Sequence, residues 1–458
     1  MTEGLLWLLA AAHLELTLFA AVGILIGGID DLLVDLIWII RSIWRRLTVY
    51  RVHARACTAV LTPSAPGRLA VFVAAWNESA VIGPMVRTAL ARWTSPNFRL
   101  YVGCYPNDAA TRAVLAEIAD PRLRVVVNPR AGPTTKADNL NSVWRALLAD
   151  EARDGQPVKA VVLHDAEDLV HPHELRIFDA LIERFSLVQL PVLPLIEQER
   201  GFWARAISAT YADEFAEAHA KQMVVREAVG AGLPSAGVGC AFAREMLGRI
   251  AGAAGTPFDA ASVTEDYELG LRIRELGGRA AFVRLPGRPG GRAVAVRAHF
   301  PDVIEEAVRQ KARWVAGIAL SGWRRLGWRG GLAERWMRLR DRRAILAALV
   351  LFAAYLSLAG SVLFTLAGRP PHFGPGLEAL ILAATLILVW RIVLRAICVG
   401  REYGLAEALR SVPRMVLGNL IAIAASRRGL VRYVREARGG TIFWDKTAHR
   451  FPRTITPE

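Results

Sequence analysis

Long apolar runs near both ends of the chain enclose a middle part in which short apolar runs alternate with polar stretches. Residues 4–28 are apolar except for His13 and Glu15, and they are numerous enough to cross a bilayer as a helix. This run lacks a basic leader and a small-residue cleavage site, so the pattern predicts a retained anchor and not a removed signal peptide.

Acidic residues follow this run, at the start of a second apolar stretch that covers residues 32–40. Asp31 and Asp35 lie one helical turn apart, with leucine and isoleucine on the other face, which is typical of a helix at the membrane surface. We therefore expect residues 1–50 to form a transmembrane anchor followed by an interfacial helix, although the length leaves a second crossing open.

Two apolar runs near the C-terminus are long enough to span a membrane. Residues 344–368 form an uninterrupted run directly after Arg342 and Arg343. Residues 377–399 form the other, in which Arg391 and Arg395 come late enough to snorkel to the cytoplasmic surface.

A third C-terminal run, residues 415–425, has about half the length that a crossing needs. If it crossed, the arginines between residues 427 and 438 would lie outside the cytoplasm, against the usual charge bias. We therefore expect an interfacial or re-entrant helix. Residues 331–430 then hold the C-terminal membrane helices, and residues 431–458 form a cytoplasmic tail.

The middle of the chain, residues 51–330, has the pattern of a globular α/β domain. Short β-rich runs alternate with helical stretches, which predicts a mostly parallel sheet whose ligands bind at the carboxyl ends of the strands. The predicted strands cover residues 69–75, 100–104, 123–127, 158–163 and 187–193.

The chain carries a formal net charge of +15, and nearly all of the cations are arginines. These arginines crowd beside the apolar runs, and no nucleic-acid-binding motif accompanies them. Attraction to an anionic cytoplasmic leaflet therefore explains the charge better than binding to nucleic acid does. The four scattered cysteines form no CxxC pair, which fits a reducing compartment. Together these features predict a multi-pass protein of a bacterial inner membrane with its globular domain in the cytoplasm.

Carboxylates follow the fourth predicted strand in His164-Asp165-Ala166-Glu167-Asp168. On an extended segment Asp165 and Glu167 point the same way, while Asp168 points across. Two oxygen ligands one pleat apart can hold Mg²⁺ or Mn²⁺, and such an ion neutralises a diphosphate as it departs. Because an apolar strand directly precedes the motif, we prefer this interpretation to a solvated acidic loop or a helix cap.

Two further acidic motifs precede helical stretches. Asn77-Glu78 follows the first predicted strand, and Thr264-Glu265-Asp266 opens a later helix. Each alone is as readily explained by a helix cap or a partner of the helix dipole. In combination with the metal carboxylates, Asp266 is the natural base for a sugar hydroxyl that attacks an anomeric carbon.

Gln310, Arg313 and Trp314 share one face of an amphipathic helix. Arginine can grip phosphate oxygens through paired donors, and a tryptophan face is a platform for a sugar ring. A buried tryptophan beside an arginine that snorkels at the membrane surface explains the same residues equally well. His299 lies shortly before this helix, and we expect it to be structural and not a metal ligand.

Taken in order, these motifs resemble glycosyltransferase family 2, the class that contains processive polysaccharide synthases. The resemblance covers roughly residues 68–314 and implies a GT-A fold, a nucleotide-sugar donor and inversion by single displacement. It implies that Asp165 and Glu167 hold the metal and the pyrophosphate, and that Asp266 is the base with Glu265 beside it. The other implied site residues are Asn77, Glu78, Asp108, Lys136, Gln310 and Arg313 for the donor, and Trp314 and Gly239 for the acceptor.

One turn departs from the family pattern. The second strand ends in Cys104-Tyr105-Pro106-Asn107-Asp108, where the family has a paired-aspartate turn that reads uracil. Asp108 is the residue that can replace this turn, and the nucleotide base is therefore left open. The wider chain is similar to a bacterial branch of the family, the phage adsorption protein B-like proteins, through residues 28–32, 105–108, 213–217, 234–239 and 444–447.

The resemblance predicts an enzyme that transfers a sugar from a UDP-sugar to a growing glycan or a membrane-associated acceptor in exopolysaccharide synthesis. Membrane lipids and envelope export proteins are its expected partners. Two alternatives stay open: a single-addition lipid glycosyltransferase, and a docking or receptor protein built on the same fold. We further hypothesise that the tail at residues 444–451 folds back and gates the active site.

Overall fold

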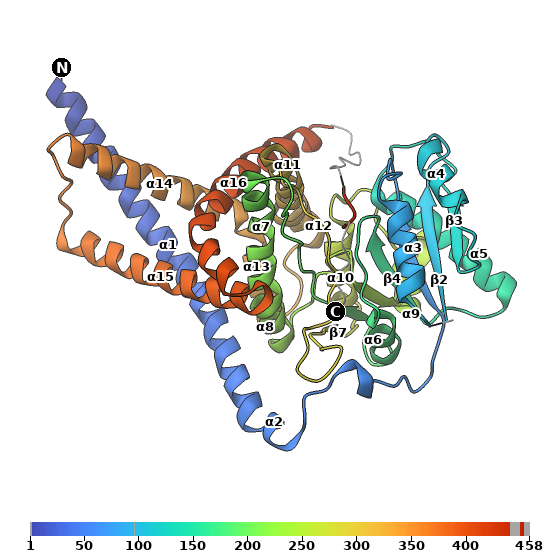
Figure 1. Cartoon of the computed structure of the whole chain (residues 1–458). Helices are drawn as coiled ribbons and strands as arrows, with labels where there is room; N and C mark the ends of the chain where they lie inside the picture. Colours follow the sequence, from blue (N-terminus) through green and yellow to red (C-terminus); the bar gives the residue numbers. More distant parts are fainter. Residues whose placement is uncertain (1, 96, 440–448, 453–458) are drawn as a thin grey trace.

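A computed structural model describes residues 2–95, 97–439 and 449–452 of the chain, and its core is a seven-stranded sheet in the order β3-β2-β1-β4-β6-β5-β7 (Figure 1). β1 pairs in parallel with β2 and β4, β2 with β3, and β5 with β7, whereas β6 runs antiparallel to β4 and β5. The predicted, mostly parallel sheet is confirmed. The strands are β1 (Leu69–Ala74), β2 (Phe98–Cys104), β3 (Leu123–Val127), β4 (Ala160–Asp165), β5 (Leu187–Gln189), β6 (Cys240–Ala243) and β7 (Ala280–Phe282).

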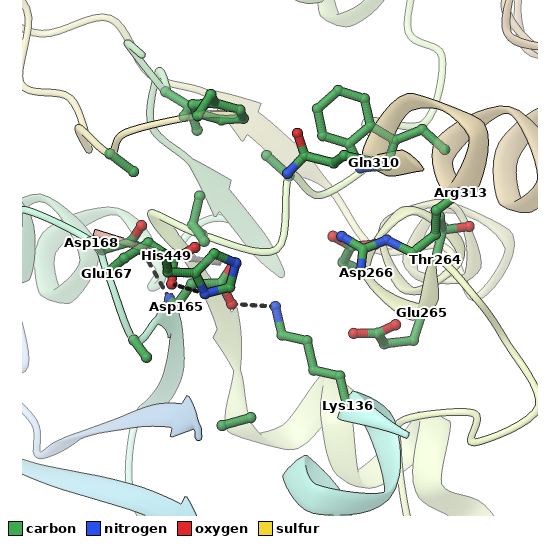
Figure 2. A pocket seen from close by; sticks show the side chains of 18 of the residues that line it. Lys136, Asp165, Glu167, Asp168, Thr264, Glu265, Asp266, Gln310, Arg313 and His449 are labelled. Atoms are coloured by element: carbon green, nitrogen blue, oxygen red, sulfur yellow. Dashed lines mark hydrogen bonds and ion pairs between the residues drawn. The ribbon is translucent and has the colours of Figure 1, made fainter. Parts of the chain in front are cut away.

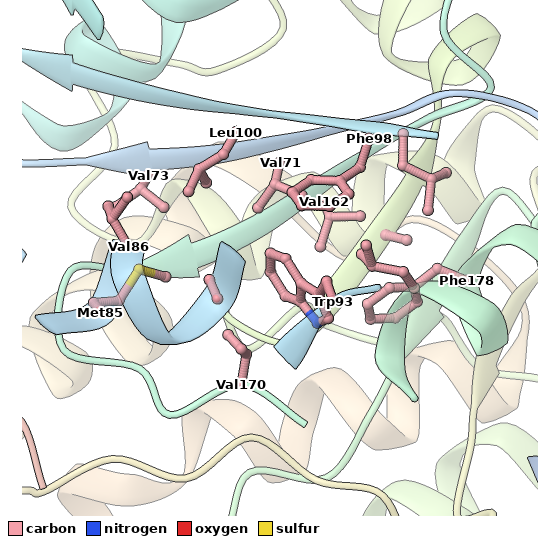
Figure 3. Packing of buried hydrophobic residues seen from close by; sticks show 14 of the residues in the cluster. Val71, Val73, Met85, Val86, Trp93, Phe98, Leu100, Val162, Val170 and Phe178 are labelled. Atoms are coloured by element: carbon pink, nitrogen blue, oxygen red, sulfur yellow. The ribbon is translucent and has the colours of Figure 1, made fainter. Parts of the chain in front are cut away.

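Helices cover both faces of this sheet, which is why its central strands are apolar on both sides. In β1, Val71 and Val73 face α3 (Ile82–Arg92) and α6 (Glu174–Leu181), where Trp93 fills the centre of the cluster (Figure 3). Phe72 faces the opposite side, towards α5 (Lys136–Asp154), α9 (Arg244–Ala251) and α10 (Glu265–Glu275). Burial of these two clusters holds the carboxyl ends of β1 and β4 side by side, with Ala74 opposite Asp165.

Among the described residues, four helices are long and apolar enough to cross a membrane, judged by length and composition. They are α1 (Thr2–Leu47), α14 (Ala344–Leu366), α15 (Pro375–Tyr403) and α16 (Leu405–Ala437). In Figure 1, α1, α14 and α15 extend away from the sheet, and α16 lies against α7 (Phe202–Glu217) and α11 (Ile304–Trp314).

Two sequence-based expectations about these helices need correction. The expected anchor and separate interfacial helix form one continuous helix, α1, because no residue breaks the pattern between residues 28 and 32. The run at 415–425 lies within the 33-residue α16, which continues through Pro413 and is longer than the apolar pattern alone indicated.

Asp31 and Asp35 of α1 lie inside the protein. Asp31 accepts hydrogen bonds from Arg340 (2.8 Å) and Arg343 (2.6 Å) and is 8% exposed. Asp35 accepts bonds from Lys221 (2.5 Å) and from the Trp390 indole (2.9 Å). These contacts fasten α1 to α13 (Leu332–Arg342), to α15 and to the π-helical turn η2 (Ala218–Gln222), so the acidic face of α1 serves a tertiary contact.

Candidate active site

A cavity of about 170 Å³ opens where β1 and β4 end. The start of α5, the start of α10, one face of α11, α16 and the segment 449–452 complete its wall. Figure 2 shows the carboxylates of β4 on one side of this cavity, the carboxylates of α10 and Arg313 on the other, and Lys136 reaching between them. The residues predicted at the ends of the first and fourth strands, Glu78, Asp165 and Glu167, thus line one cavity.

The loop after β4 is held in place from behind by His164. The His164 Nδ1 lies 2.9 Å from Asp168 Oδ2, which also accepts a hydrogen bond from the Asp165 N–H (3.0 Å). The other ring nitrogen lies 3.1 Å from Glu174 Oε2. Burial favours the neutral ring, but Glu174 and Asp168 outweigh it and raise the pKa of His164 to about 10. An imidazolium clamped between two carboxylates thus fixes the backbone of the loop that carries Asp165 and Glu167.

The two carboxylates of this loop differ in their surroundings. Burial alone would raise the pKa of Asp165, but the ion pair with Lys136 outweighs this effect and lowers the pKa. Burial raises the pKa of Glu167 to about 8, although the charge of His449, whose Nδ1 lies 3.2 Å from Glu167 Oε2, acts in the opposite direction. A buried carboxylate whose charge its neighbours do not fully offset fits a cation-binding position.

A group of possible metal ligands gathers at Glu167. Among the described residues, ligand atoms of Glu78, Glu167 and His449 all lie within 4.8 Å of one another. The His449 Nδ1 lies 2.8 Å from Glu78 Oε1 and 3.2 Å from Glu167 Oε2. Asp165 lies at the same strand end but is engaged by Lys136. The residues present therefore fit a divalent cation of the Mg²⁺ or Mn²⁺ type, with oxygen donors in the majority.

The carboxylates of α10 face the cavity from the other side. Glu265 is 8% exposed, and burial, followed by the charge of Asp266, raises its pKa to about 7. Burial also raises the pKa of Asp266, and this effect outweighs the opposing charge of Lys136. Asp266 Oδ1 accepts a hydrogen bond from the Tyr267 N–H (2.8 Å), which fixes the carboxylate at the start of the helix. A raised pKa suits a general base, because it makes the carboxylate a stronger proton acceptor.

Gln310, Arg313 and Trp314 line the cavity together from α11. The half-buried Trp314 packs edge-on against Tyr211, with ring centroids 6.0 Å apart, and against Phe300 at 6.5 Å. The Gln310 side-chain oxygen is buried without a hydrogen-bond partner among the described residues. The three residues therefore share one face of α11, and Trp314 is both a packing residue and part of the wall.

Three of the predicted site residues lie outside the cavity wall and support its loops. Asp108 is buried, caps α4 (Ala109–Ala116) by accepting from the Thr111 N–H (3.2 Å), and accepts from the Asn77 N–H (2.6 Å). Asn77 has a positive φ of 52°, so this bond stabilises a tight turn after β1. Gly239 has a φ of 57° and donates its N–H to Leu163 O (3.0 Å) just before β6.

Among the residues of the wall that the sequence interpretation did not name as site residues are two basic ones, Arg432 of α16 and His449 of the tail. Neither belongs to a local pattern near a predicted strand end. The tail hypothesis named residues 444–451, of which 444–448 lie outside the described residues. His449 does line the cavity, and Arg450 contacts Asp302 at 3.1 Å.

Comparison with known proteins places this site in a family. Residues 66–317 match the model described as glycosyltransferase-like family 2. Bacteriophage adsorption protein B of Escherichia coli (strain K12) and bacteriophage N4 adsorption protein B of Escherichia coli O157:H7 are each 37% identical to the chain over 474 residues. Each match covers 97% of this chain, which spans 63% of the length of these relatives.

Among solved structures, a mannosyltransferase, PcManGT from Pyrobaculum calidifontis, in complex with GDP-Man and Mn²⁺, has a similar fold with a TM-score of 0.51. The similarity covers 92% of this chain and 99% of that one, at 17% sequence identity. The likeness at this identity concerns the fold, and it extends over the apolar helices as well as the sheet.

Proposed function

This chain belongs to glycosyltransferase family 2 and has its GT-A fold, and from that premise we propose that it is a membrane-bound, inverting glycosyltransferase. It transfers a sugar from a nucleotide-diphosphate donor to a growing glycan or a membrane-associated acceptor. The observation that carries the proposal is that two sets of charged side chains face each other across one cavity. The half-buried Asp266, whose pKa burial raises, lies with Arg313 on one side and faces the Lys136–Asp165 pair and the Glu167 loop on the other (Figure 2).

The donor diphosphate binds on the β4 side in this proposal. Asp165 and Glu167 would hold a Mg²⁺ or Mn²⁺ ion, which neutralises the diphosphate when it is bound. Lys136 and Arg313 add fixed positive charge to the same region, and burial raises the value of each charge by excluding water. The donor in this proposal is a UDP-sugar. Asp108 accepts hydrogen bonds from the Asn77 and Thr111 amides, so it is not the residue that recognises the base.

Sugar transfer is a single displacement. Asp266 accepts the proton of the acceptor hydroxyl while the hydroxyl oxygen forms its bond to the anomeric carbon. The bond from that carbon to the diphosphate oxygen breaks on the opposite face, and the nucleoside diphosphate leaves with the electron pair. The attack from the opposite face inverts the anomeric configuration. Trp314 offers its ring face to the acceptor sugar.

The four apolar helices support a membrane location, and the arginines beside them favour a cytoplasmic catalytic domain at a bacterial inner membrane. We therefore place the reaction in exopolysaccharide synthesis, with the product delivered to envelope export proteins.

The test is sugar transfer by membranes that contain the full chain, with UDP- and GDP-sugars offered separately and product glycans identified by mass spectrometry. We expect a released nucleoside diphosphate and a glycan for one donor, and at least about a 1,000-fold loss in Asp266→Asn, which keeps the shape of the base and removes its function. Wild-type activity no greater than that of the variant would contradict the enzyme proposal.

A docking or receptor role is the second candidate, because the curated relatives are named for bacteriophage adsorption. Cells that carry Asp266→Asn separate the two. A docking protein retains phage adsorption in this variant, whereas adsorption that depends on a synthesised glycan is lost together with sugar transfer.

A further inference from the structure

The C-terminal segment 449–452 is anchored in the active site by three consecutive side chains. His449 contacts Glu78 and Glu167, as described above. Arg450 lies 3.1 Å from Asp302 and 3.4 Å from Glu197. Phe451 packs against the hydrophobic cluster beneath β1 and β4. An apolar contact, an ion pair and a half-buried imidazole together hold this segment in place, and His449 forms part of the cavity wall.

We propose that His449 is a protein ligand of the divalent ion, together with Glu167 and Glu78, so that ion binding and docking of segment 449–452 stabilise each other. The inference rests on the proposed function only in that the ion is the one the transferase uses.

The distances agree with this assignment. In an octahedral site with bonds of about 2.1 Å, neighbouring ligand atoms lie about 3 Å apart. The separations of His449 Nδ1 from Glu78 Oε1 and Glu167 Oε2 are 2.8 and 3.2 Å. Glu78 is 3% exposed and Glu167 is 9% exposed, so bulk water screens the charge of neither carboxylate. The remaining coordination positions would face the cavity, where the donor diphosphate is proposed to bind.

The identity of the donor atoms predicts a metal preference. Carboxylate oxygens alone suit Mg²⁺, whereas an imidazole nitrogen raises the affinity for transition metals such as Mn²⁺. A site in which one imidazole joins the carboxylates is therefore expected to prefer Mn²⁺ to Mg²⁺. Replacing His449 by aspartate makes the ligand set all-oxygen, and this change is expected to lower the ratio of Mn²⁺ to Mg²⁺ affinity while keeping a metal bound.

The experiment measures Mn²⁺ binding to the purified full chain in detergent, without donor, from the electron paramagnetic resonance signal of the free ion. We expect His449→Ala to weaken Mn²⁺ binding at least about tenfold, because loss of a group that merely supports a metal ligand already weakens metal binding by about that factor. His53→Ala, which removes an exposed histidine outside the cavity, is the matched control. His299→Ala tests the other histidine of the wall and is expected to keep the affinity.

A spectroscopic readout separates a ligand from a structural neighbour. Bound Mn²⁺ should show the modulation of a directly coordinated nitrogen in pulsed resonance spectra, retained in His299→Ala and lost in His449→Ala and His449→Asp. Mn²⁺ should also slow the removal of the last residues by carboxypeptidase, because it locks the segment. Arg450→Ala, which loosens the segment, should weaken both effects.

Three results would overturn the inference: unchanged Mn²⁺ affinity in His449→Ala, tighter binding in that variant, or a nitrogen signal that persists without His449. Tighter binding would mean that the imidazole occupies the place of the ion and competes with it. Failure of the proposed function is a separate outcome. If the chain shows the expected Mn²⁺ behaviour but transfers no sugar, the inference stands and the proposed function is wrong. If the chain transfers sugar but binds Mn²⁺ independently of His449, the proposed function stands and the inference is wrong.

Discussion

Substitution of Gly237 by alanine tests the placement of the proposed base. Gly237 has a φ of 75°, and a Cβ built on it would lie 2.3 Å from Asp266 Oδ2, whereas ordinary van der Waals contact begins at 3.4 Å. The carboxylate must therefore move by about 1 Å, because the neighbouring Ser235 hydroxyl accepts from the Gly237 N–H (3.1 Å) and helps to hold the turn.

Two costs can be separated in this variant. A side chain in the left-handed region costs about 1–2 kcal/mol of stability. Gly155, at the end of α5, has a φ of 67° and no heavy atom within 4 Å of an added Cβ, so Gly155→Ala carries the backbone cost alone. Displacement of a reacting group by about 1 Å costs about 100-fold in rate. We therefore expect similar losses of thermal stability in the two variants, but about a 100-fold loss of turnover in Gly237→Ala only.

The assay is initial-rate sugar transfer by the purified full chain at saturating donor, together with thermal unfolding in the same detergent. Gly155→Ala should turn over at nearly the wild-type rate. If Gly237→Ala transfers sugar as fast as Gly155→Ala while Asp266→Asn is inactive, the carboxylate tolerates the displacement, and the argument from its fixed position is wrong. If both glycine variants lose activity equally, backbone strain explains the loss.

Three further outcomes follow from buried charges. Asp31→Asn removes one of the two carboxylate partners of the half-buried arginines Arg340 and Arg343, which keep Asp30, so it should cost about 1–3 kcal/mol and lower the melting temperature, whereas the exposed Glu378→Gln should leave it unchanged. Burial, with the charge of Arg284 added, lowers the pKa of His219 to about 4, below the usual value of about 6.5. Between these two pH values the unfolded chain binds more protons than the folded chain, so the free energy of unfolding should rise with pH. The rise should be less steep in His219→Gln, and equal slopes in the two proteins would contradict the lowered pKa of His219. Because burial raises the pKa of Asp266 and a base must be ionised, the acid limb of kcat/KM should lie above about pH 4, and a profile that stays flat down to pH 4 would exclude Asp266 as the base.

The sheet was predictable because strands buried on both faces appear as continuous apolar runs. The run at 69–75 is β1 and the run at 158–163 is β4, both fully covered by helices apart from the half-buried Asp165. β6 and β7 were not identified, because they have four and three residues and carry too little pattern to separate from a loop. Their partners lie far along the chain, so only the tertiary structure defines them.

The site was predictable to the extent that it follows local rules. Carboxyl ends of neighbouring parallel strands meet at one sheet edge, which brings Glu78 and Glu167 together, and helical spacing aligns Gln310 with Trp314. His449 comes from the other end of the chain, and no local spacing indicates where such a residue docks. The turn at Asp108 shows the converse: the sequence marked the right loop, but its carboxylate is used by two backbone amides.

The arginines that the sequence attributes to membrane charge bias have a second use in the fold. Arg395 of α15 lies 2.9 Å from Glu217, and Arg414 of α16 contacts Asp213 at 2.7 Å. Both carboxylates belong to α7, whose Tyr211 packs against Trp314 in the cavity wall. Because a helix moves as a body, α7 links the position of the two apolar helices to the aromatic face proposed for the acceptor sugar. The same arginines therefore also fasten the apolar helices to the side of the cavity proposed for the acceptor.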